Sequence, residues 1–98
     1  MDEVKFNAAV ARALLRHREG GGIGMLGEKT LHSALKYYYE PNELSHEQKE
    51  LGFFADIKNE DGIIEVQTGS LGALRPKLTE YLKTTDVTVV HRSEERRV

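Results

Sequence analysis

The sequence predicts an α/β fold in which two helices, two strands, a third helix and a last strand form a mixed sheet flanked by helices. Three observations support it. Apolar residues recur at helical spacing in two segments before residue 40, two β-like runs follow around a turn, and a further helical segment precedes a last β-like run. Because a helix joins the last two strands, we expect them to be parallel neighbours with a right-handed crossover.

Composition limits the class of protein. The chain has 98 residues, of which 39% are hydrophobic and 31% are charged, and this fits one domain with one core. We divide residues 1–98 into an N-terminal helix with a Gly-rich connector (1–22), a core (23–91) and a tail (92–98). No run approaches the roughly 18 apolar residues of a membrane span, and no signal-peptide pattern is present. We therefore expect a cytoplasmic protein without membrane contact.

Cysteine and charge content exclude several kinds of site. The chain has no cysteine, which excludes disulfides, thiolate zinc sites, iron–sulfur clusters and cysteine nucleophiles. Any bound metal must therefore be held by oxygen or imidazole. The formal net charge of -2 gives no global attraction to nucleic acid, so phosphate binding would need basic residues gathered on one face.

The first helix is predicted over residues 3–18. Its apolar residues recur at helical spacing: Val4, Ala8, Ala11, Leu14 and Leu15. Lys5, Arg12 and Arg16 share another face, which we expect to be solvated. The glycines of residues 20–24 end the pattern. They lack the order of a phosphate-binding loop and are typical of a flexible connector.

The second helix is predicted over residues 26–39. Its apolar stripe consists of Leu31, Ala34, Leu35 and Tyr38. Glu28 continues this stripe into the first turn, either because the helix dipole favours an acid there or because a functional carboxylate lies on the buried side. His32 lies one turn later on the same face and is a candidate accessory residue. Pro41 ends the helix, and residues 41–50, with His46, are predicted to form a loop.

The remaining elements follow from alternation and turn chemistry. Residues 51–58 and 63–68 are β-like, and the Asp-Gly pair between them indicates a hairpin. A third helix is predicted after Ser70, which could cap it, and residues 86–91 form the final strand. Pro76 would kink the third helix or delay its start unless it falls in the first turn.

The hairpin brings acidic side chains together. Alternation places Glu65 and Gln67 on one face, opposite the side chains of Ile64 and Val66, and a two-residue turn sets Asp56 across from Glu65 or Gln67. Facing carboxylates repel unless a cation lies between them, and a hard ion such as Mg²⁺ suits carboxylate oxygens. The other interpretation is a charge-alternating strand with one solvated face.

Phe54 and Ile63 belong to the same face by alternation, which suggests a shallow cleft rather than open solvent. An aspartate within the apolar run of residues 53–57 is disfavoured without a partner. The acidic face is therefore expected to be more than a solvated surface.

These residues resemble the PD-(D/E)XK nuclease superfamily. The similar pieces are GEKTLHSAL with Glu28, GFFADIK with Asp56, and IIEVQTG with Glu65 and Gln67. They also resemble short bacterial proteins of Firmicutes type that are grouped with these nucleases. The resemblance covers residues 23–91 and implies a restriction-endonuclease-like α-β-β-α-β core with an extra N-terminal helix.

The resemblance implies roles for these residues. Asp56 and Glu65 would ligate Mg²⁺ or Mn²⁺ together with the backbone carbonyl of Val66, and Glu28 would orient the metal shell or a second ion. Gln67 would occupy the place of the usual lysine beside the attacking water.

Gln67 departs from the family pattern because an amide carries no positive charge. Lys29 and Lys58 are the candidates to supply that charge from elsewhere in space.

The expected function is that of a metal-dependent endonuclease that hydrolyses phosphodiester bonds of nucleic acid, with DNA as the first candidate, and that acts as a homodimer. Basic residues are available on the first helix and at Arg75, Lys77, Lys83, Arg92, Arg96 and Arg97. Two alternatives stay open. One is a catalytically inactive nuclease fold that binds DNA or a protein, and the other is a metal-free interaction domain in which Asp56 and Glu65 belong to salt bridges.

Overall fold

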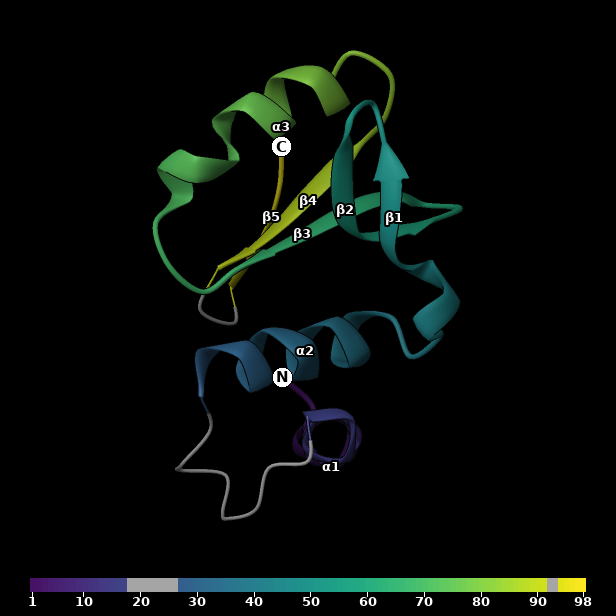
Figure 1. The fold of residues 1–98 in the computed structure, drawn as a ribbon, viewed down its shortest axis with the longest axis vertical. Helices are drawn as coiled ribbons and strands as arrows, with labels where there is room; N and C mark the ends of the chain where they lie inside the picture. The colour runs from purple at the N-terminus through teal and green to yellow at the C-terminus, as the bar shows by residue number, and fades with distance from the viewer. Residues whose placement is uncertain (18–26, 92–93) are drawn as a thin grey trace. The chain divides into compact units, whose positions relative to one another are not determined.

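The structure is a computed structural model that describes residues 1–17, 27–91 and 94–98 (Figure 1). The predicted Gly-rich connector and the predicted helix start at Leu26 lie outside these residues. The chain forms two compact units, residues 1–43 and 44–98, and each is described by itself. None of the described helices is long and apolar enough to cross a bilayer.

The predicted α/β class is confirmed. An N-terminal helix pair precedes a five-stranded mixed sheet with one later helix. The elements in chain order are α1 (Glu3–His17), α2 (Glu28–Tyr39), η2 (Glu43–Ser45), β1 (His46–Glu50), β2 (Phe53–Asn59), β3 (Gly62–Gln67), η3 (Leu71–Leu74), α3 (Arg75–Tyr81), β4 (Val87–His91) and β5 (Glu94–Arg97).

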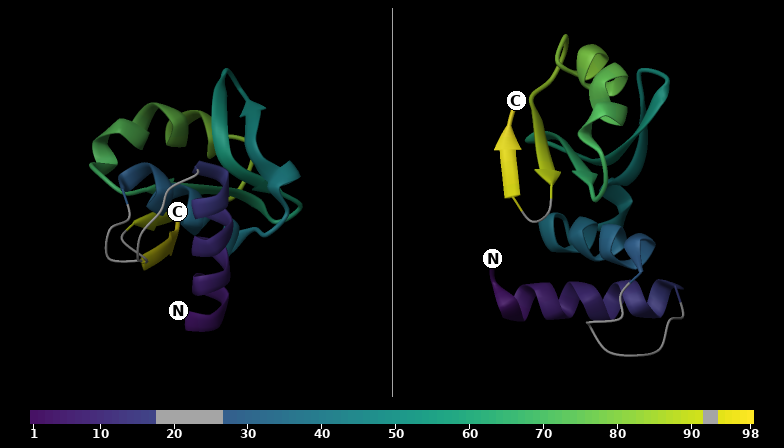
Figure 2. Two further views of the ribbon diagram at one scale, coloured as in Figure 1. Left: turned by 60° about the horizontal axis from the view of Figure 1, so that its bottom comes forward. Right: turned by 90° about the vertical axis from the view of Figure 1, so that its left-hand side faces the viewer.

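The N-terminal unit is a pair of packed helices (Figure 2). Their common core consists of Ala9, Val10, Ala13, Ala34 and Tyr37. The alanines allow the two backbones to approach closely. Val4 and Leu15, which belong to the apolar pattern that predicted α1, are instead 81% and 80% exposed. Apolar residues occupy two opposite faces of α1, and helical spacing alone does not decide which face is buried.

The basic residues of α1 contact tyrosines of α2. The Arg12 guanidinium lies 4.2 Å from the centroid of the Tyr37 ring, and Lys5 Nζ lies 4.7 Å from that of Tyr38. Arg12 also donates a 2.6 Å hydrogen bond to the carbonyl of Pro41. Lys5 and Arg12 are exposed, as expected for a solvated face, and their cation–π contacts additionally connect this face to α2.

The strands lie in the order β1-β2-β3-β4-β5, and β3 and β4 are parallel while the other neighbours are antiparallel. The predicted parallel pair is thus confirmed. Two edge strands were missed, since β1 lies in the segment 41–50 predicted as a loop and β5 lies in the predicted tail 92–98. Their sequences, HEQKE and EERR, have no apolar face and therefore no alternating pattern that would indicate a strand. Edge strands are held mainly by backbone hydrogen bonds and often carry charge.

The core of the sheet unit lies between α3 and one face of the sheet (Figure 1). It consists of Ala55, Ile63, Leu74, Tyr81, Val87 and Val89. Glu65 follows Ile63 by two residues in β3 and therefore points to this helix-covered face. The expected shallow cleft on that face is wrong at Glu65, whose exposure is 0%.

The third helix begins as the sequence predicted. Ser70 Oγ accepts a hydrogen bond from the amide of Gly72 at 3.2 Å, which caps η3. Pro76 lies in the first turn of α3, and the regular helix starts only at Arg75. The proline therefore delays the α-helix without kinking it, since the missing N–H of a first-turn residue has no intrahelical partner in any case.

The β2–β3 hairpin turns at Gly62 under two constraints. Its φ is 124°, in the region that favours glycine, and a Cβ at this position would lie 2.6 Å from the carbonyl oxygen of Asp86. The same carbonyl accepts the amide of Ile63 at 3.0 Å. Glycine is therefore required both by the turn and by the connection to β4.

We expect Gly62→Ala to lower the free energy of unfolding by about 2–3 kcal/mol, because it adds a clash to a strained φ. Urea unfolding followed by circular dichroism measures this loss. Gly52→Ala is the matched control, since Gly52 has a φ of 84° but no atom within 4 Å of an added Cβ. It should lose only about 1 kcal/mol. Equal losses would contradict the clash with Asp86.

Candidate active site

Asp56 and Glu65 meet where the pairing of β2 and β3 ends. The backbone register runs from Asn59–Gly62 to Ile57–Ile64 and thereby sets Asp56 across from Glu65, one of the two predicted registers. Beyond the Ile57–Ile64 pair, hydrogen bonds to side chains replace those between the two backbones. Glu65 Oε2 accepts the amide of Asp56 at 2.8 Å, and Asp56 Oδ2 accepts the amide of Val66 at 2.8 Å. Each carboxylate is thus fixed by the opposite strand.

The strand geometry is irregular around Asp56. Three consecutive residues of β2, Ala55, Asp56 and Ile57, are buried, which interrupts the alternation of a regular strand. Glu47 of β1, which lies between the partners of Ile57 and Ala55, has a φ of 51°, a conformation that is uncommon for a residue other than glycine. This irregularity places the Asp56 side chain, 8% exposed, beside the fully buried Glu65.

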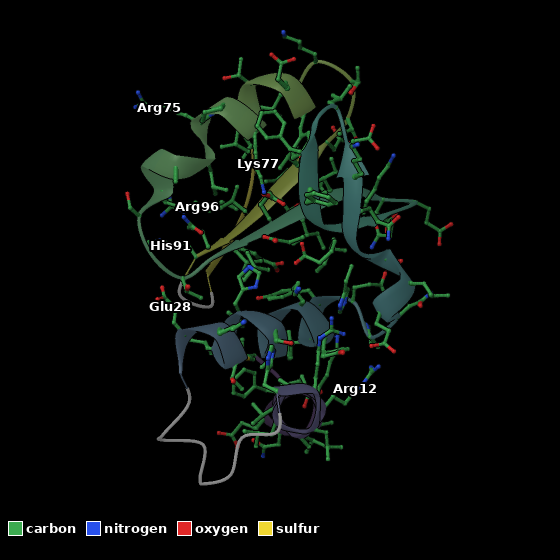
Figure 3. All side chains as sticks on the ribbon, in the orientation of Figure 1. Arg12, Glu28, Arg75, Lys77, His91 and Arg96 are labelled. Carbon is green, nitrogen blue, oxygen red and sulfur yellow. The ribbon has the colours of Figure 1, made fainter. Side chains whose placement is uncertain are left out.

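Lys77 of α3 completes this group. Its Nζ donates to Glu65 Oε1 at 2.9 Å and to the carbonyl of Phe54 at 2.8 Å, and 26% of its side chain is exposed. Figure 3 shows Lys77 reaching from α3 toward the strands, whereas Arg75 on the same helix points away. The sequence identified Lys77 only as one of several basic residues. Its spacing from Leu74 and Tyr81, within the apolar stripe of α3, was the available signal.

Burial and mutual repulsion dominate the electrostatics of Glu65. Its pKa is raised above the ordinary value of 4.5, first by burial and then by the charge of Asp56. The amide of Asp56 and the ammonium of Lys77 act in the opposite direction, and they offset part of this rise. The pKa of Glu65 therefore stays raised even with the Lys77 ammonium beside it, and a further cation would favour the ionised form.

Tyr81 is a second residue near the carboxylates that no sequence motif indicated. Burial raises its pKa to about 12, and the charges of Glu65, Asp56 and Glu50 add to this rise. Its hydroxyl is buried and has no hydrogen-bond partner among the described residues. At neutral pH Tyr81 therefore remains a protonated donor within the electrostatic range of the carboxylates.

Other predicted residues of the sheet unit have different partners. The Gln67 amide donates to the carbonyl of Ser70 in the loop after β3. Lys58 forms an ion pair with Glu50 of the neighbouring strand β1. Neither contact places a positive charge at Glu65. His46 begins β1, across from Ile57.

Glu28, Lys29 and His32 belong to the N-terminal unit. Glu28 and Lys29 are exposed at the start of α2, while the buried residue of that turn is Thr30, with 0% exposure. The expectation that Glu28 continues the buried stripe is therefore wrong, because the helix start turns this side chain to solvent, where an acid also suits the helix dipole. The association of Glu28 and His32 with the carboxylates stays a prediction.

The donor set at Asp56 and Glu65 suits a hard divalent cation. Within the described parts of the chain, no group of three or more His, Cys, Asp or Glu side chains is arranged to hold a metal ion. The two adjacent carboxylates nevertheless offer oxygens of the kind that Mg²⁺ and Mn²⁺ prefer, and a carboxylate oxygen that accepts one hydrogen bond keeps a second lone pair. A cation would also relieve the repulsion that raises the pKa of Glu65.

A separate hollow of about 380 Å³ lies between α3 and the strands β4 and β5. It is lined by Leu71, Leu74, Leu78, Val89, His91, Arg96 and Val98. None of the predicted site residues lines it, and its walls are mainly apolar. Val89 pairs with Glu65 in the sheet, so the hollow adjoins the carboxylates on the same face without containing them.

Comparison with known proteins identifies relatives without an assigned activity. Residues 29–97 match a family described as Domain of unknown function (DUF8091). A protein of Treponema pallidum (strain Nichols), described as an uncharacterized protein, is 40% identical over 70 residues, which are 70% of this chain and 28% of that protein. The chain thus spans little more than a quarter of that relative. No solved structure matches the chain. Neither match names a nuclease, so that resemblance stays a prediction.

The raised pKa of Glu65 predicts a specific pH dependence. Because the folded protein binds this proton more tightly than the unfolded chain, the contribution of Glu65 to the free energy of unfolding falls as the pH rises from about 4.5 through the folded-state pKa. Glu65→Gln removes this pH-dependent contribution, because an amide does not titrate. The variant should therefore gain stability relative to the wild type across that interval and keep a constant difference above it.

Urea unfolding of both proteins at a series of pH values measures this difference. Glu60→Gln, in the exposed hairpin turn, is the matched control. A difference between wild type and Glu65→Gln that does not change with pH would contradict the assigned electrostatics of Glu65.

Proposed function

We propose a metal-dependent nuclease activity for this chain, which belongs to the DUF8091 domain family. The proposed reaction is hydrolysis of phosphodiester bonds in nucleic acid, with DNA as the first candidate. The observation that carries the proposal is the meeting of Asp56 and Glu65 at the end of the β2–β3 ladder, where the opposite strand fixes both carboxylates.

The chain order around the site supports this proposal. A helix, an antiparallel hairpin, a second helix and a strand parallel to the second strand of the hairpin follow one another as α2, β2–β3, α3 and β4. This order is similar to the α-β-β-α-β core of restriction-endonuclease-like proteins, and β1 adds a further antiparallel strand in front of the hairpin. The acidic residues fall on the two strands of the hairpin, as the resemblance implied.

The proposed site divides the chemistry between the protein and an ion. Asp56, Glu65 and the carbonyl of Val66 would hold Mg²⁺ or Mn²⁺, which when bound lowers the pKa of water and stabilises negative charge on a phosphate. The protein's own contribution is orientation. The amides of Asp56 and Val66 fix one oxygen of each carboxylate at 2.8 Å, so that little reorganisation is needed when a cation binds.

Nucleic-acid binding would depend on local rather than global charge, given the net charge of -2. The basic residues of α1 already contact tyrosines of their own unit. In the sheet unit, Arg75, Arg96 and Arg97 are exposed and available for phosphate contacts. A homodimer would present two such sites to two strands, and we retain it as part of the proposal.

The Lys77 ion pair favours one alternative function. Lys77 already compensates part of the buried charge of Glu65, as a salt bridge does in a protein that needs no metal. Gln67, at the place of the usual lysine, is uncharged and is hydrogen bonded to Ser70. Both contacts fit a catalytically inactive module that binds DNA or a protein. Metal binding and cleavage distinguish this module from the enzyme.

We expect Glu65→Gln to lower metal-dependent cleavage at least about 100-fold, because it removes a ligand charge while keeping the shape of the side chain. Alanine is the poorer test, since it would leave a cavity and the unpaired amide of Asp56 in a buried region. Labelled single-stranded, duplex and branched DNA, with and without Mn²⁺, are the substrates.

Glu60→Gln serves as the control and should cleave like the wild type. Titration calorimetry with Mn²⁺ should show binding to the wild type and weaker binding to Glu65→Gln. A wild-type protein that binds duplex DNA but neither binds Mn²⁺ nor cleaves would support the inactive module, whereas full activity in Glu65→Gln would refute the assigned site.

A further inference from the structure

We propose that Lys77 is the substrate-contacting cation of this site and that α3, rather than β3, delivers it to the phosphodiester anion. The inference rests on the proposed nuclease function and extends it to a residue outside the family-like pattern. It adds Lys77 to Lys29 and Lys58 as a residue that compensates for the neutral Gln67.

Two acceptors of different kinds hold the Lys77 ammonium. One is Glu65 Oε1 at 2.9 Å, and the other is the carbonyl oxygen of Phe54 at 2.8 Å. These acceptors belong to β3 and β2, so the ammonium spans the two strands that carry the carboxylates. A flexible lysine is thereby fixed at one position, which lowers the entropy lost when it meets a substrate.

The ammonium retains a donor for an anion. A protonated lysine has three N–H groups, and the contacts with Glu65 and Phe54 use two of them. Lys77 makes no further hydrogen bond with the described residues. The Lys77 side chain is 26% exposed, so solvent reaches part of it. A phosphodiester oxygen is an acceptor of the charge and size that this third N–H requires.

Lys58 and Gln67, two other candidates for this role, do not combine a positive charge with a contact to Glu65. Lys58 is paired with Glu50, and the amide of Gln67 is bound to the carbonyl of Ser70. Glu65 has Lys77 as its one ion-pair partner within the described residues. A cation from a helix can thus supply the charge that the residue two positions after Glu65 supplies in the usual pattern, because packing of α3 on the sheet brings Lys77 to the same carboxylate.

Kinetics of Lys77 variants test this role. Lys77→Met should lower kcat for cleavage of labelled DNA with Mn²⁺ at least about 100-fold, and Lys77→Arg should recover part of the loss. Lys49→Met is the matched control, since Lys49 is exposed on the edge strand β1 and should be dispensable. Circular dichroism of each variant shows whether the fold persists. Wild-type cleavage rates in folded Lys77→Met would overturn the proposal while leaving the nuclease function intact.

A second measurement does not depend on cleavage. The side-chain ¹⁵N signal of Lys77 should shift on titration of the wild-type protein with dimethyl phosphate in the presence of Mg²⁺, while that of Lys49 stays in place. A saturable shift in a protein that does not cleave DNA would support Lys77 as an anion contact and reject the nuclease function. Absence of the shift would overturn the proposal even if Lys77→Met unfolds.

Discussion

The reciprocal hydrogen bonds between the two strands of the hairpin are the interaction on which the site depends. A buried carboxylate is costly unless donors surround it, and here the amides of Asp56 and Val66 supply them across the strands. Hydrogen bonds to charged groups typically contribute about 1.5–3 kcal/mol each. Because these bonds replace the ladder where it ends, the same contacts hold β2 against β3 and fix the direction of Asp56 and Glu65.

At Glu65, the charged form that the proposed chemistry needs is the form that lowers the stability of the fold. Burial and the charge of Asp56 raise the pKa of Glu65, so its ionised form weakens the folded state at neutral pH even though Lys77 offsets part of the effect. A hydrophobic residue at position 65 would fit the apolar surroundings formed by Ile63 and Val89. A buried carboxylate with a raised pKa is frequent at functional sites and unfavourable for stability elsewhere. This conflict is a reason to seek a function at the carboxylate pair, in addition to the structural role that its hydrogen bonds have.

The elements that could be predicted are those with a local signal. The Asp-Gly pair and the alternation of apolar and polar residues predicted the β2–β3 hairpin. Pro76 predicted that α3 starts late, with the proline in its first turn. The strands β1 and β5 could not be found in this way, because edge strands without an apolar face are specified by the neighbour they pair with. Helical spacing located α1 but not its buried side, since Val10 and Val4 lie on opposite apolar faces.

For the candidate site, the sequence alone determined that Asp56, Glu65 and Gln67 share one face of the hairpin, because alternation fixes the side of each strand, and the structure then selected the register that sets Asp56 across from Glu65. Only the tertiary structure decided that Glu65 is covered by α3, that its cation is Lys77, and that Gln67 and Lys58 have other partners. The physical reason is that local periods define which residues share a face of one element, whereas a contact between two elements depends on how their faces pack.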